Sequence, residues 1–551
     1  MICDLKTKFK EQLGIIVEDK KKCRLLVNGK LEWQQENEDN YAPTGQSKTL
    51  MMMFAVAVET GRKFRGIDIV GAFLAEAVKD DDTAFVEIPP LLMKYFSDEF
   101  QDYRQEGLGD GPKPIKELTE QESAELMHTS ADRHNPYDRQ VAKLLKSIYG
   151  RRRAPQVFNE GLDAHLTAHG YKRSGPDACA YYKELDGSGE PTDMFFTIAV
   201  DDFACFPREE KHFQELVQVL NKKYTTKVAG NLNGHLGMKV NEYADGSVGL
   251  SQPKTLQAIF NLFDIADDDP GVETPMRMDF NDEEQDKGEK IDIETYRRPL
   301  GTIIHVLKTR GDIAYASGRL GSRQHRCTDK DLAALKHLAR YLKRTQDYEL
   351  TFTPSNREQA MEVIKVFGWS DHAHQVHTDG KGQTGTGLSI GNHDTGMFDT
   401  QSKKDTINVR STTEGETGGG CRVTTGVIWA RNMTAEWGYT MLEATTLYED
   451  NQSMIKLCSK PSGNHQRTKH FTGDINFMLD NVRRGIIQLE YLKTEEMPVD
   501  ILTKAKGPTA HQRCASRILG PQHGKAEGRT DKREVHFAKR VRVSEYETED
   551  D

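Results

Sequence analysis

Two adjacent aspartates, Asp201 and Asp202, stand between two apolar runs in the segment from Asp193 to Phe206. Short apolar runs around a polar pair are typical of a β-hairpin, so we expect both carboxylates at its turn. Charged side chains are rarely held between apolar strands unless a cation or a partner neutralises them. Carboxylate oxygens are ligands that Mg²⁺ prefers, so the pattern predicts a divalent-cation site suited to phosphoryl transfer.

Basic residues gather in two places, although the formal net charge of the chain is −10. The sign of the charge reverses between Val141 and Arg173, and a second basic stretch runs from Lys336 to Arg344. Such local patches can hold phosphates in an acidic protein. The alternative for each patch is an ordinary solvated helix face.

The length, composition and cysteine content of the chain limit the class of protein. The 551 residues are 36% hydrophobic and 29% charged, which suggests about three or four domains with apolar cores. No run approaches the roughly 18 apolar residues of a membrane span, and the first residues lack the layout of a signal peptide. The eight cysteines are scattered without a C-x-x-C motif, which argues against a disulfide framework or a zinc ribbon and favours an intracellular location.

Hydrophobic spacing predicts the elements that must position the aspartates. A helix is expected over 44–60 and a strand over Phe64–Ile69, followed by helices at Glu209–Tyr224 and Lys254–Phe263. A helical region is expected over 296–348, where leucines recur at helical spacing as an ordinary core stripe. Residues 264–294 are acidic and indicate a linker, whereas 362–506 alternate strand-like and helical runs.

Short motifs follow one another along residues 20–350. Asp68 lies in Gly-Ile-Asp-Ile-Val-Gly-Ala-Phe-Leu, and the aspartate pair ends Ala199-Val-Asp-Asp202. The other motifs are Ser147-Ile-Tyr-Gly-Arg-Arg-Arg-Ala-Pro155, Leu236-Gly-Met-Lys-Val240, Leu250-Ser-Gln-Pro-Lys254, Tyr296-Arg-Arg-Pro-Leu-Gly301 and Thr309-Arg-Gly-Asp-Ile-Ala-Tyr315. In order and spacing this series resembles the reverse transcriptases of copia-type long-terminal-repeat retrotransposons.

The resemblance implies a right-hand polymerase in which Asp68, Asp201 and Asp202 bind Mg²⁺ or Mn²⁺ and act in catalysis. It also implies that Arg24, in Lys22-Cys-Arg-Leu25, touches the incoming triphosphate. A surface arginine is the alternative reading of Arg24. Arg153 and Gln252 lie in matched motifs and are expected to bind substrate.

A second series of carboxylates lies downstream. Its elements are Gly368-Trp-Ser-Asp371, Ser411-Thr-Thr-Glu414, Tyr448-Glu-Asp-Asn-Gln452, Arg467-Thr-Lys-His470 and Val499-Asp-Ile-Leu-Thr-Lys504. They resemble the ribonuclease H elements of the same retrotransposons. The resemblance implies that Asp371, Glu414, Asp450 and Asp500 hold two metal ions while water attacks RNA paired to DNA.

The two resemblances together imply an α+β and α/β multidomain chain. Residues 1–265 would form the palm and incomplete fingers with a polar insertion at 91–138, and residues 266–361 an acidic linker and a helical thumb or connection region. Residues 362–506 would form a ribonuclease H-like α/β domain, and 507–551 a disordered charged tail. The implied partners are an RNA template, a DNA primer, an RNA–DNA hybrid and deoxynucleoside triphosphates, without a membrane. We expect an intracellular location, in cytoplasmic virus-like particles or the nucleus, and leave the oligomeric state open.

Several departures from the family pattern keep other functions open. Ala199 replaces a tyrosine of the family, Arg153 a glutamine, and Phe158 a tryptophan. The glycines after Glu414, from Gly415 to Gly420, predict a broken helix, and the strands expected before Lys22 are mostly absent. A catalytically decayed or domesticated remnant that still binds nucleic acid is therefore one alternative, and a chain in which only the ribonuclease H region works is another.

A structural zinc site is a competing prediction for one histidine-rich stretch. His372, His374, His377 and Asp379 offer zinc-binding atoms within a short segment. Their spacing is not a recurrent ligand spacing, and no cysteine is near. We therefore do not favour a zinc site here, and we expect His470 to form hydrogen bonds rather than to bind a metal.

Overall fold

The computed structural model describes residues 41–78, 144–355, 364–459 and 469–523, and the backbone of four short strands. These strands pair as β1 (Ile2–Asp4) with β2 (Lys22–Arg24) and as β4 (Phe85–Glu87) with β5 (Val141–Lys143). The predicted polar insertion at 91–138 lies outside the described residues. Within the described ranges no helix is both long enough and apolar enough to cross a membrane.

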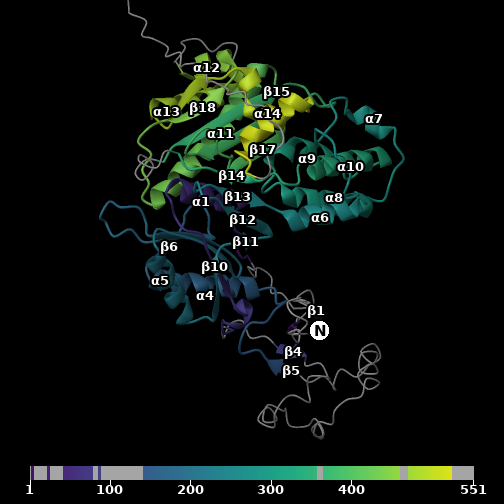
Figure 1. The fold of residues 1–551 in the computed structure, drawn as a ribbon. Helices are drawn as coiled ribbons and strands as arrows, with labels where there is room; N and C mark the ends of the chain where they lie inside the picture. The colour runs from purple at the N-terminus through teal and green to yellow at the C-terminus, as the bar shows by residue number, and fades with distance from the viewer. Residues whose placement is uncertain are drawn as a thin grey trace, which may run out of the picture.

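A six-stranded antiparallel sheet forms the centre of the amino-terminal region, in the lower half of Figure 1. Its strand order is β10-β3-β9-β8-β7-β6. The strands are β3 (Arg65–Ile69), β6 (Tyr171–Arg173), β7 (Ala180–Lys183), β8 (Met194–Ala199), β9 (Asp202–Pro207) and β10 (Thr226–Asn231). The pairing of Ala199 with Asp202 confirms the predicted hairpin and its turn at the aspartates.

Helices cover both faces of this sheet. Phe196 and Phe203 pack with α4 (Ala154–Ala168) and α5 (Glu210–Asn221) on one face. Phe195 and Phe206 point to the other face and share a core with α1 (Ser47–Glu59). Because both faces are covered, β8 is a continuous apolar run rather than an alternating one.

Helix α1 lies between the two large sheets of the molecule. Every residue from Thr49 to Glu59 is buried, which confirms the predicted helix and explains its apolar composition all round. The helix contacts β8 and β9 on one side and β16 (Gln383–Ile390) of the carboxyl-terminal sheet on the other. One hydrophobic core therefore joins the two regions.

A small sheet and a group of helices follow the aspartate hairpin. The four strands, in sheet order, are β11 (Gly234–His235), β12 (Met238–Glu242), β13 (Val248–Ser251) and β14 (Leu350–Phe352). The helices are α6 (Pro253–Leu262), α7 (Asp282–Asp286), α8 (Ile293–Val306), α9 (Ala314–Gly321) and α10 (Asp329–Arg344). The predicted helical region and its leucine stripe are confirmed, since Leu335, Leu338 and Leu342 are fully buried.

The acidic segment at 264–294 is not the simple linker that its composition indicated. Ile265 and Met276 pack in the core of the helical region. Asp282 is buried and pairs with Arg319 and Arg323 at N–O distances of 3.2 and 3.5 Å. The acidic charge is thus neutralised by arginines that lie far along the chain, which composition alone does not reveal.

The carboxyl-terminal region is built on a mixed five-stranded sheet, at the top of Figure 1. Its order is β17-β16-β15-β18-β19, with β15, β16 and β17 antiparallel and β15, β18 and β19 parallel. The other strands are β15 (Val366–Ala373), β17 (Asp399–Lys404), β18 (Thr445–Glu449) and β19 (Ile487–Tyr491), and the helices are α11 (Thr412–Glu436), α12 (Gln452–Ser459) and α13 (Thr472–Arg483). The predicted alternation of strands and helices is confirmed.

The prediction of a broken helix after Glu414 is wrong. Helix α11 runs unbroken for 25 residues through the glycines. A Cβ atom on Gly415 would lie 2.2 Å from the ring of His372, and one on Gly420 would lie 2.4 Å from Met454. These glycines let the helix approach the sheet closely, and that packing outweighs their low helix propensity.

The prediction of disorder from residue 507 is wrong for the part of the tail that the structure describes. Residues Pro508–Leu519 form helix α14, with Cys514, Ile518 and Leu519 buried. These side chains pack against the short 3₁₀ helix Pro498–Leu502 and Trp369 of β15. The prediction failed because the few apolar residues of this short amphipathic helix are spaced among charged residues, so the composition of the segment looked polar.

Candidate active sites

The first carboxylate group lies at the edge of the hairpin in the six-stranded sheet. Asp68 of β3 stands directly opposite Asp202 of β9, so both side chains project from the same face of the sheet. Asp201 lies in the turn, where its carbonyl oxygen accepts a hydrogen bond of 2.9 Å from the Ile69 N–H. The sheet thus brings together the three aspartates that the sequence predicted.

The turn that carries Asp201 is strained. Val200 has a φ angle of 64°, a left-handed conformation that β-branched residues rarely adopt. Its side chain is half-exposed at the tip of the hairpin. Strain of this kind persists where neighbouring structure enforces it and is common at functional sites.

Asp202 has a close neighbour outside its own sheet. The Nδ1 atom of His235, a buried residue of β11, lies 2.9 Å from Oδ2 of Asp202. All three aspartates are partly exposed. Among the described residues, one oxygen from each of these three aspartates does not lie within 4.8 Å of the others, as the oxygens of the second carboxylate group, described below, do.

The three predicted substrate-binding residues lie in different settings. Only the backbone of Arg24 is described, in β2, so the predicted contact of its side chain with a triphosphate lies outside the described residues. Arg153 is the residue before α4 and is partly exposed. Gln252 is 1% exposed, and its amide bonds His305 and Thr309, so the structure gives it an internal role in place of the predicted substrate contact.

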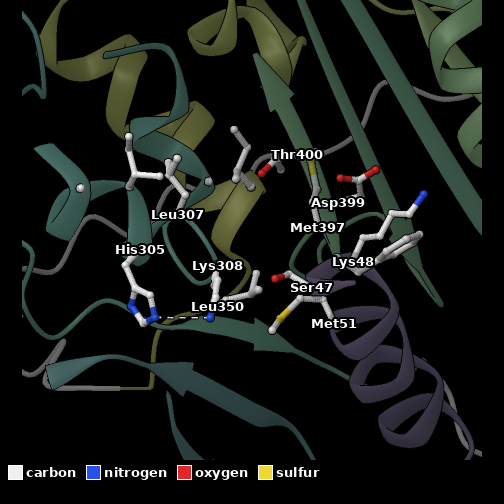
Figure 2. Close-up of a pocket in the computed structure, with 15 residues that line it drawn as sticks. Ser47, Lys48, Met51, His305, Leu307, Lys308, Leu350, Met397, Asp399 and Thr400 are labelled. Carbon is white, nitrogen blue, oxygen red and sulfur yellow. Dashed lines mark hydrogen bonds between the residues drawn. The ribbon is translucent and has the colours of Figure 1, made fainter. Parts of the chain in front are cut away.

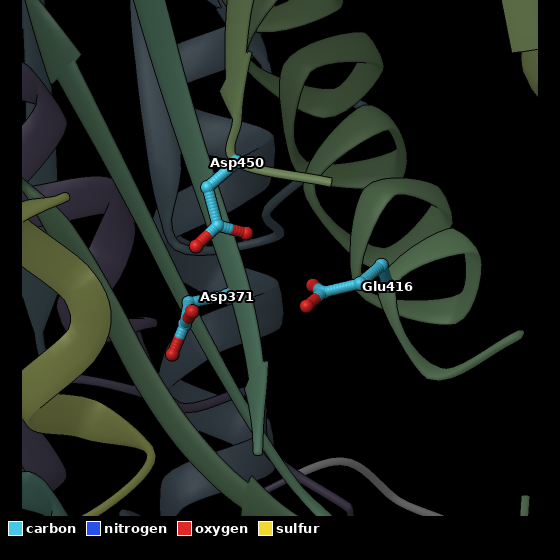
Figure 3. A group of neighbouring side chains, drawn as sticks. All are labelled: Asp371, Glu416 and Asp450. Carbon is cyan, nitrogen blue, oxygen red and sulfur yellow. The ribbon is translucent and has the colours of Figure 1, made fainter. Parts of the chain in front are cut away.

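The second carboxylate group converges at the carboxyl-terminal sheet. Asp371 projects from β15, Asp450 follows the end of β18, and Glu416 faces them from α11 (Figure 3). One carboxylate oxygen from each of the three lies within 4.8 Å of the others. Oxygen ligands at this spacing match what Mg²⁺ and Mn²⁺ require.

Glu416, rather than the predicted Glu414, completes this group. Residues two apart on a helix point about 200° away from each other, so the two glutamates face opposite sides of α11. Glu414 lies in the first turn, where it accepts a hydrogen bond from the Arg410 N–H and contacts His470. The sequence signal that would have selected Glu416 is helical spacing. Glu416 lies on the same side of α11 as the buried residues Gly419, Gly420, Val423, Val427 and Ala430.

Burial and mutual repulsion make the second group electrostatically unusual. Burial, with the charges of Asp500 and Asp450, raises the pKa of Asp371 to about 6. Burial also raises the pKa of Glu416 well above its ordinary range, and the charges of Glu449 and Asp371 add to this. Clustered carboxylates with raised pKa values are typical of functional sites that a cation neutralises.

Glu449, which sequence reasoning did not select, borders the group. It is fully buried, and burial raises its pKa to about 8. Ser370 donates to its Oε2 at 2.8 Å and the Asn451 N–H donates to its Oε1 at 3.0 Å. Glu416 Oε2, by contrast, is buried with no hydrogen-bond partner among the described residues, so the donor set fits a divalent cation.

Asp500, the fourth predicted ligand, lies beside the group and is held by lysines. Its Oδ1 is 2.8 Å from Lys504 Nζ, and its Oδ2 contacts Lys506. It is close enough to Asp371 to raise the pKa of that carboxyl. Thr503, three residues on, donates to Asp371 Oδ2 at 2.6 Å.

The histidine-rich stretch does not assemble a zinc site within the part of the chain that the structure describes. His372 Nε2 lies 2.8 Å from Asp405 Oδ2, and His377 bonds Gln383 and Arg319. Asp379 pairs with Lys404 at 2.9 Å. His372, His377 and Asp379 thus each have a partner of their own, whereas the buried Nδ1 of His374 has no hydrogen-bond partner among the described residues.

Comparisons with known proteins place these sites in a family context. Residues 129–278 match the family model for reverse transcriptase (RNA-dependent DNA polymerase). The chain is 24% identical over 481 residues to the retrovirus-related Pol polyprotein from transposon RE1 of Arabidopsis thaliana, covering 87% of this chain and 29% of that protein. It is 26% identical over 387 residues to the corresponding polyprotein from transposon TNT 1-94 of Nicotiana tabacum, covering 69% of this chain and 28% of that protein.

These matches bear out the resemblance that the motifs predicted. The alignment with the first relative extends over most of the chain, and the family match includes Asp201 and Asp202. The chain spans about 29% of the length of the first two curated relatives. It is a relative of copia-type retrotransposon Pol polyproteins and carries a reverse transcriptase domain.

Proposed function

We propose that the protein is an RNA-directed DNA polymerase with a ribonuclease H activity, each at one of the two carboxylate groups. The polymerase would use the six-stranded sheet as its palm, the helices α6 to α10 as a thumb and connection, and the carboxyl-terminal sheet as its ribonuclease H domain. The observation that carries the proposal is the convergence of Asp371, Glu416 and Asp450 in a chain with a reverse transcriptase domain.

In the polymerase site, Asp68, Asp201 and Asp202 would hold divalent cations, and the template, primer and nucleotide would lie over their face of the sheet. Bound cations would lower the pKa of the attacking hydroxyl and would offset the negative charge of the phosphoryl group that is transferred. The protein's part is to fix the carboxylates: the Asp68–Asp202 strand pairing sets their spacing. The strained turn at Val200 holds Asp201 at the tip of the hairpin.

In the ribonuclease H site, Asp371, Glu416 and Asp450 would hold the cations, with Asp500 at the border. The orphaned oxygen of Glu416 gives one ligand position. Thr503 and Thr494 each donate to an aspartate of the group, at 2.6 Å to Asp371 and 2.7 Å to Asp450. These hydroxyls orient the carboxylates, as residues bordering a metal site commonly do.

The test uses the full chain with two substrates. Primer extension on an RNA template and cleavage of a labelled RNA–DNA hybrid should both require Mg²⁺ or Mn²⁺. Asp202→Asn should abolish extension and spare cleavage, whereas Asp450→Asn should do the reverse. Absence of both reactions at every metal concentration would reject the proposal.

A remnant that binds nucleic acid without polymerising is the second candidate. It is favoured by the polymerase aspartates, which do not converge as the second group does, and by the contact of Asp202 with His235. Binding of a primer–template measured by fluorescence anisotropy, without extension and unchanged in Asp202→Asn, would support it.

A further inference from the structure

A cavity of about 540 Å³ lies away from both carboxylate groups, where α1, α8, β14 and β17 meet (Figure 2). Its walls are largely apolar and come from segments far apart in the sequence. Apolar lining residues include Met51, Leu350, Met397 and Ile518. A cavity of this size and composition suits a small organic molecule rather than a polymer.

One end of the cavity presents two hydrogen-bond donors, His305 Nε2 and Lys308 Nζ, and the contacts of Gln252 establish the first of them. The Gln252 side-chain nitrogen donates to the backbone carbonyl of His305 at 3.2 Å, which fixes the orientation of the amide, because a carbonyl only accepts. The same nitrogen lies 3.0 Å from His305 Nδ1, so that ring atom is the acceptor. A neutral imidazole therefore carries its proton on Nε2.

The proton on Nε2 faces a second donor. Lys308 Nζ lies 3.4 Å from His305 Nε2, and both groups point into the same end of the cavity (Figure 2). Burial lowers the pKa of His305 and of Lys308, which agrees with a neutral imidazole. His305 is exposed and Lys308 is partly buried, so both N–H groups stand at the open end of the cavity, where an anion placed between them would accept from both.

Lys308 also lacks the usual neutralising partner. Among the residues that the structure describes, no carboxylate forms an ion pair with its ammonium group. The second lysine of the cavity differs, because Lys48 Nζ lies over the ring of Trp429, 4.0 Å from its centre. The charge of Lys48 also acts on Asp399, at the other side of the cavity. The uncompensated positive charge is therefore that of Lys308.

We propose that this cavity binds an amphipathic carboxylate. Its anionic head accepts hydrogen bonds from Lys308 Nζ and His305 Nε2. Its hydrocarbon body lies against the apolar residues of α1, β14 and α14 and against Met397 and Phe398, which precede β17. The site is independent of the polymerase and nuclease reactions, and the inference does not rest on the proposed function.

Calorimetric titration of the full chain with decanoate, below its micelle-forming concentration, tests the site. One molecule should bind per chain, and decanol, which has the same chain without the charge, should bind at least about tenfold more weakly, since charge-assisted hydrogen bonds are roughly twice as strong as neutral ones. Inorganic phosphate alone should bind more weakly than decanoate, because it leaves the apolar wall uncovered. No binding of decanoate, or equal binding of decanol, would overturn the proposal.

Three variants locate the ligand. Lys308→Met keeps most of the length of the unbranched side chain, removes its charge, and should weaken decanoate binding about tenfold or more. Lys48→Met, the matched control in the same cavity, should leave the affinity nearly unchanged. Gly301→Leu should weaken binding by filling space, because a Cβ there meets no atom within 4 Å and leucine suits the helix. Equal affinity in wild type and Lys308→Met would place the carboxylate elsewhere and refute the assignment.

Discussion

The two carboxylate groups of this protein are built in opposite ways. Asp371, Glu416 and Asp450 come from two strands and a helix, converge, and include two buried members. Asp68, Asp201 and Asp202 come from one hairpin and its neighbour, remain partly exposed, and stay further apart. The converged group is thus held together by the fold itself, whereas the carboxylates of the open group stay apart at the surface of their sheet.

Holding the second group together costs electrostatic free energy. Like charges held together in a buried site resist ionisation, which the raised pKa values of Asp371 and Glu416 express. The close packing of α11 on the sheet holds that arrangement in place.

The largest expected effect separates the two groups by function. Asp450→Asn should lower hybrid cleavage by about 10³-fold, the scale seen when one preorganised electrostatic contact to a transition state is lost, without changing primer extension. Asp202→Asn should show the reverse pattern. Both rates are measured on the same preparation, so parallel losses in either variant would show that the groups do not act separately.

The next effect distinguishes the two glutamates of α11. Glu416→Gln should lower hybrid cleavage by about 10²-fold, because its oxygen faces the other carboxylates. Glu414→Gln is the matched control and should change cleavage only slightly, since its carboxylate contacts His470 and the Arg410 backbone. A larger loss of cleavage in Glu414→Gln than in Glu416→Gln would support Glu414 as the metal ligand, as the sequence predicted.

The stability of the protein should depend on pH through Asp371 of the second group. The folded-state pKa of Asp371, about 6, lies above the ordinary value of 3.8 for an aspartate. Its contribution to stability is therefore fully present below about pH 4 and is lost as the pH rises through 6, by about 3 kcal/mol at roughly 1.4 kcal/mol per unit. Calorimetric unfolding in a chelator should show this loss, and Mg²⁺ should raise Tm more at pH 8 than at pH 5.

Asp371→Asn provides the control for this titration. The amide cannot ionise, so the variant should lose less stability than the wild type between pH 5 and pH 8. Equal slopes in the two proteins would mean that another group causes the effect.

The smallest effect tests the packing that holds the second group. Gly415→Ala should destabilise the protein by about 2 kcal/mol, the usual cost of overpacking, because His372, which a Cβ would strike, is buried and bonded to Asp405. Gly418→Ala in the same helix meets no atom within 4 Å and should stabilise by about 0.5–1 kcal/mol. Urea unfolding of both variants measures the contrast.

Local patterns in the sequence were sufficient for the elements that depend on them. The all-apolar run of α1, the hairpin around Asp201 and the leucine stripe of α10 follow from spacing and composition. The order of the carboxylate motifs also predicted Asp371 and Asp450 of the converged group, but it gave Glu414 in place of Glu416, and Asp500 lies at the border of that group.

Contacts between distant segments could not be read in this way. The choice between Glu414 and Glu416 depends on which side of α11 faces the sheet, and the glycines concealed the apolar stripe that marks it. The internal role of Gln252 depends on His305 and Thr309, more than fifty residues away. The arginines that order the acidic segment near Asp282 are likewise distant in the chain.

Helix α1 makes the two halves of the molecule energetically inseparable. Its residues are buried between the sheets, so removing either half would expose a large apolar surface on the other. The protein should therefore melt in one cooperative transition, and a fragment beginning near residue 362 should aggregate. A substitution in α1 should consequently disturb both carboxylate groups at once.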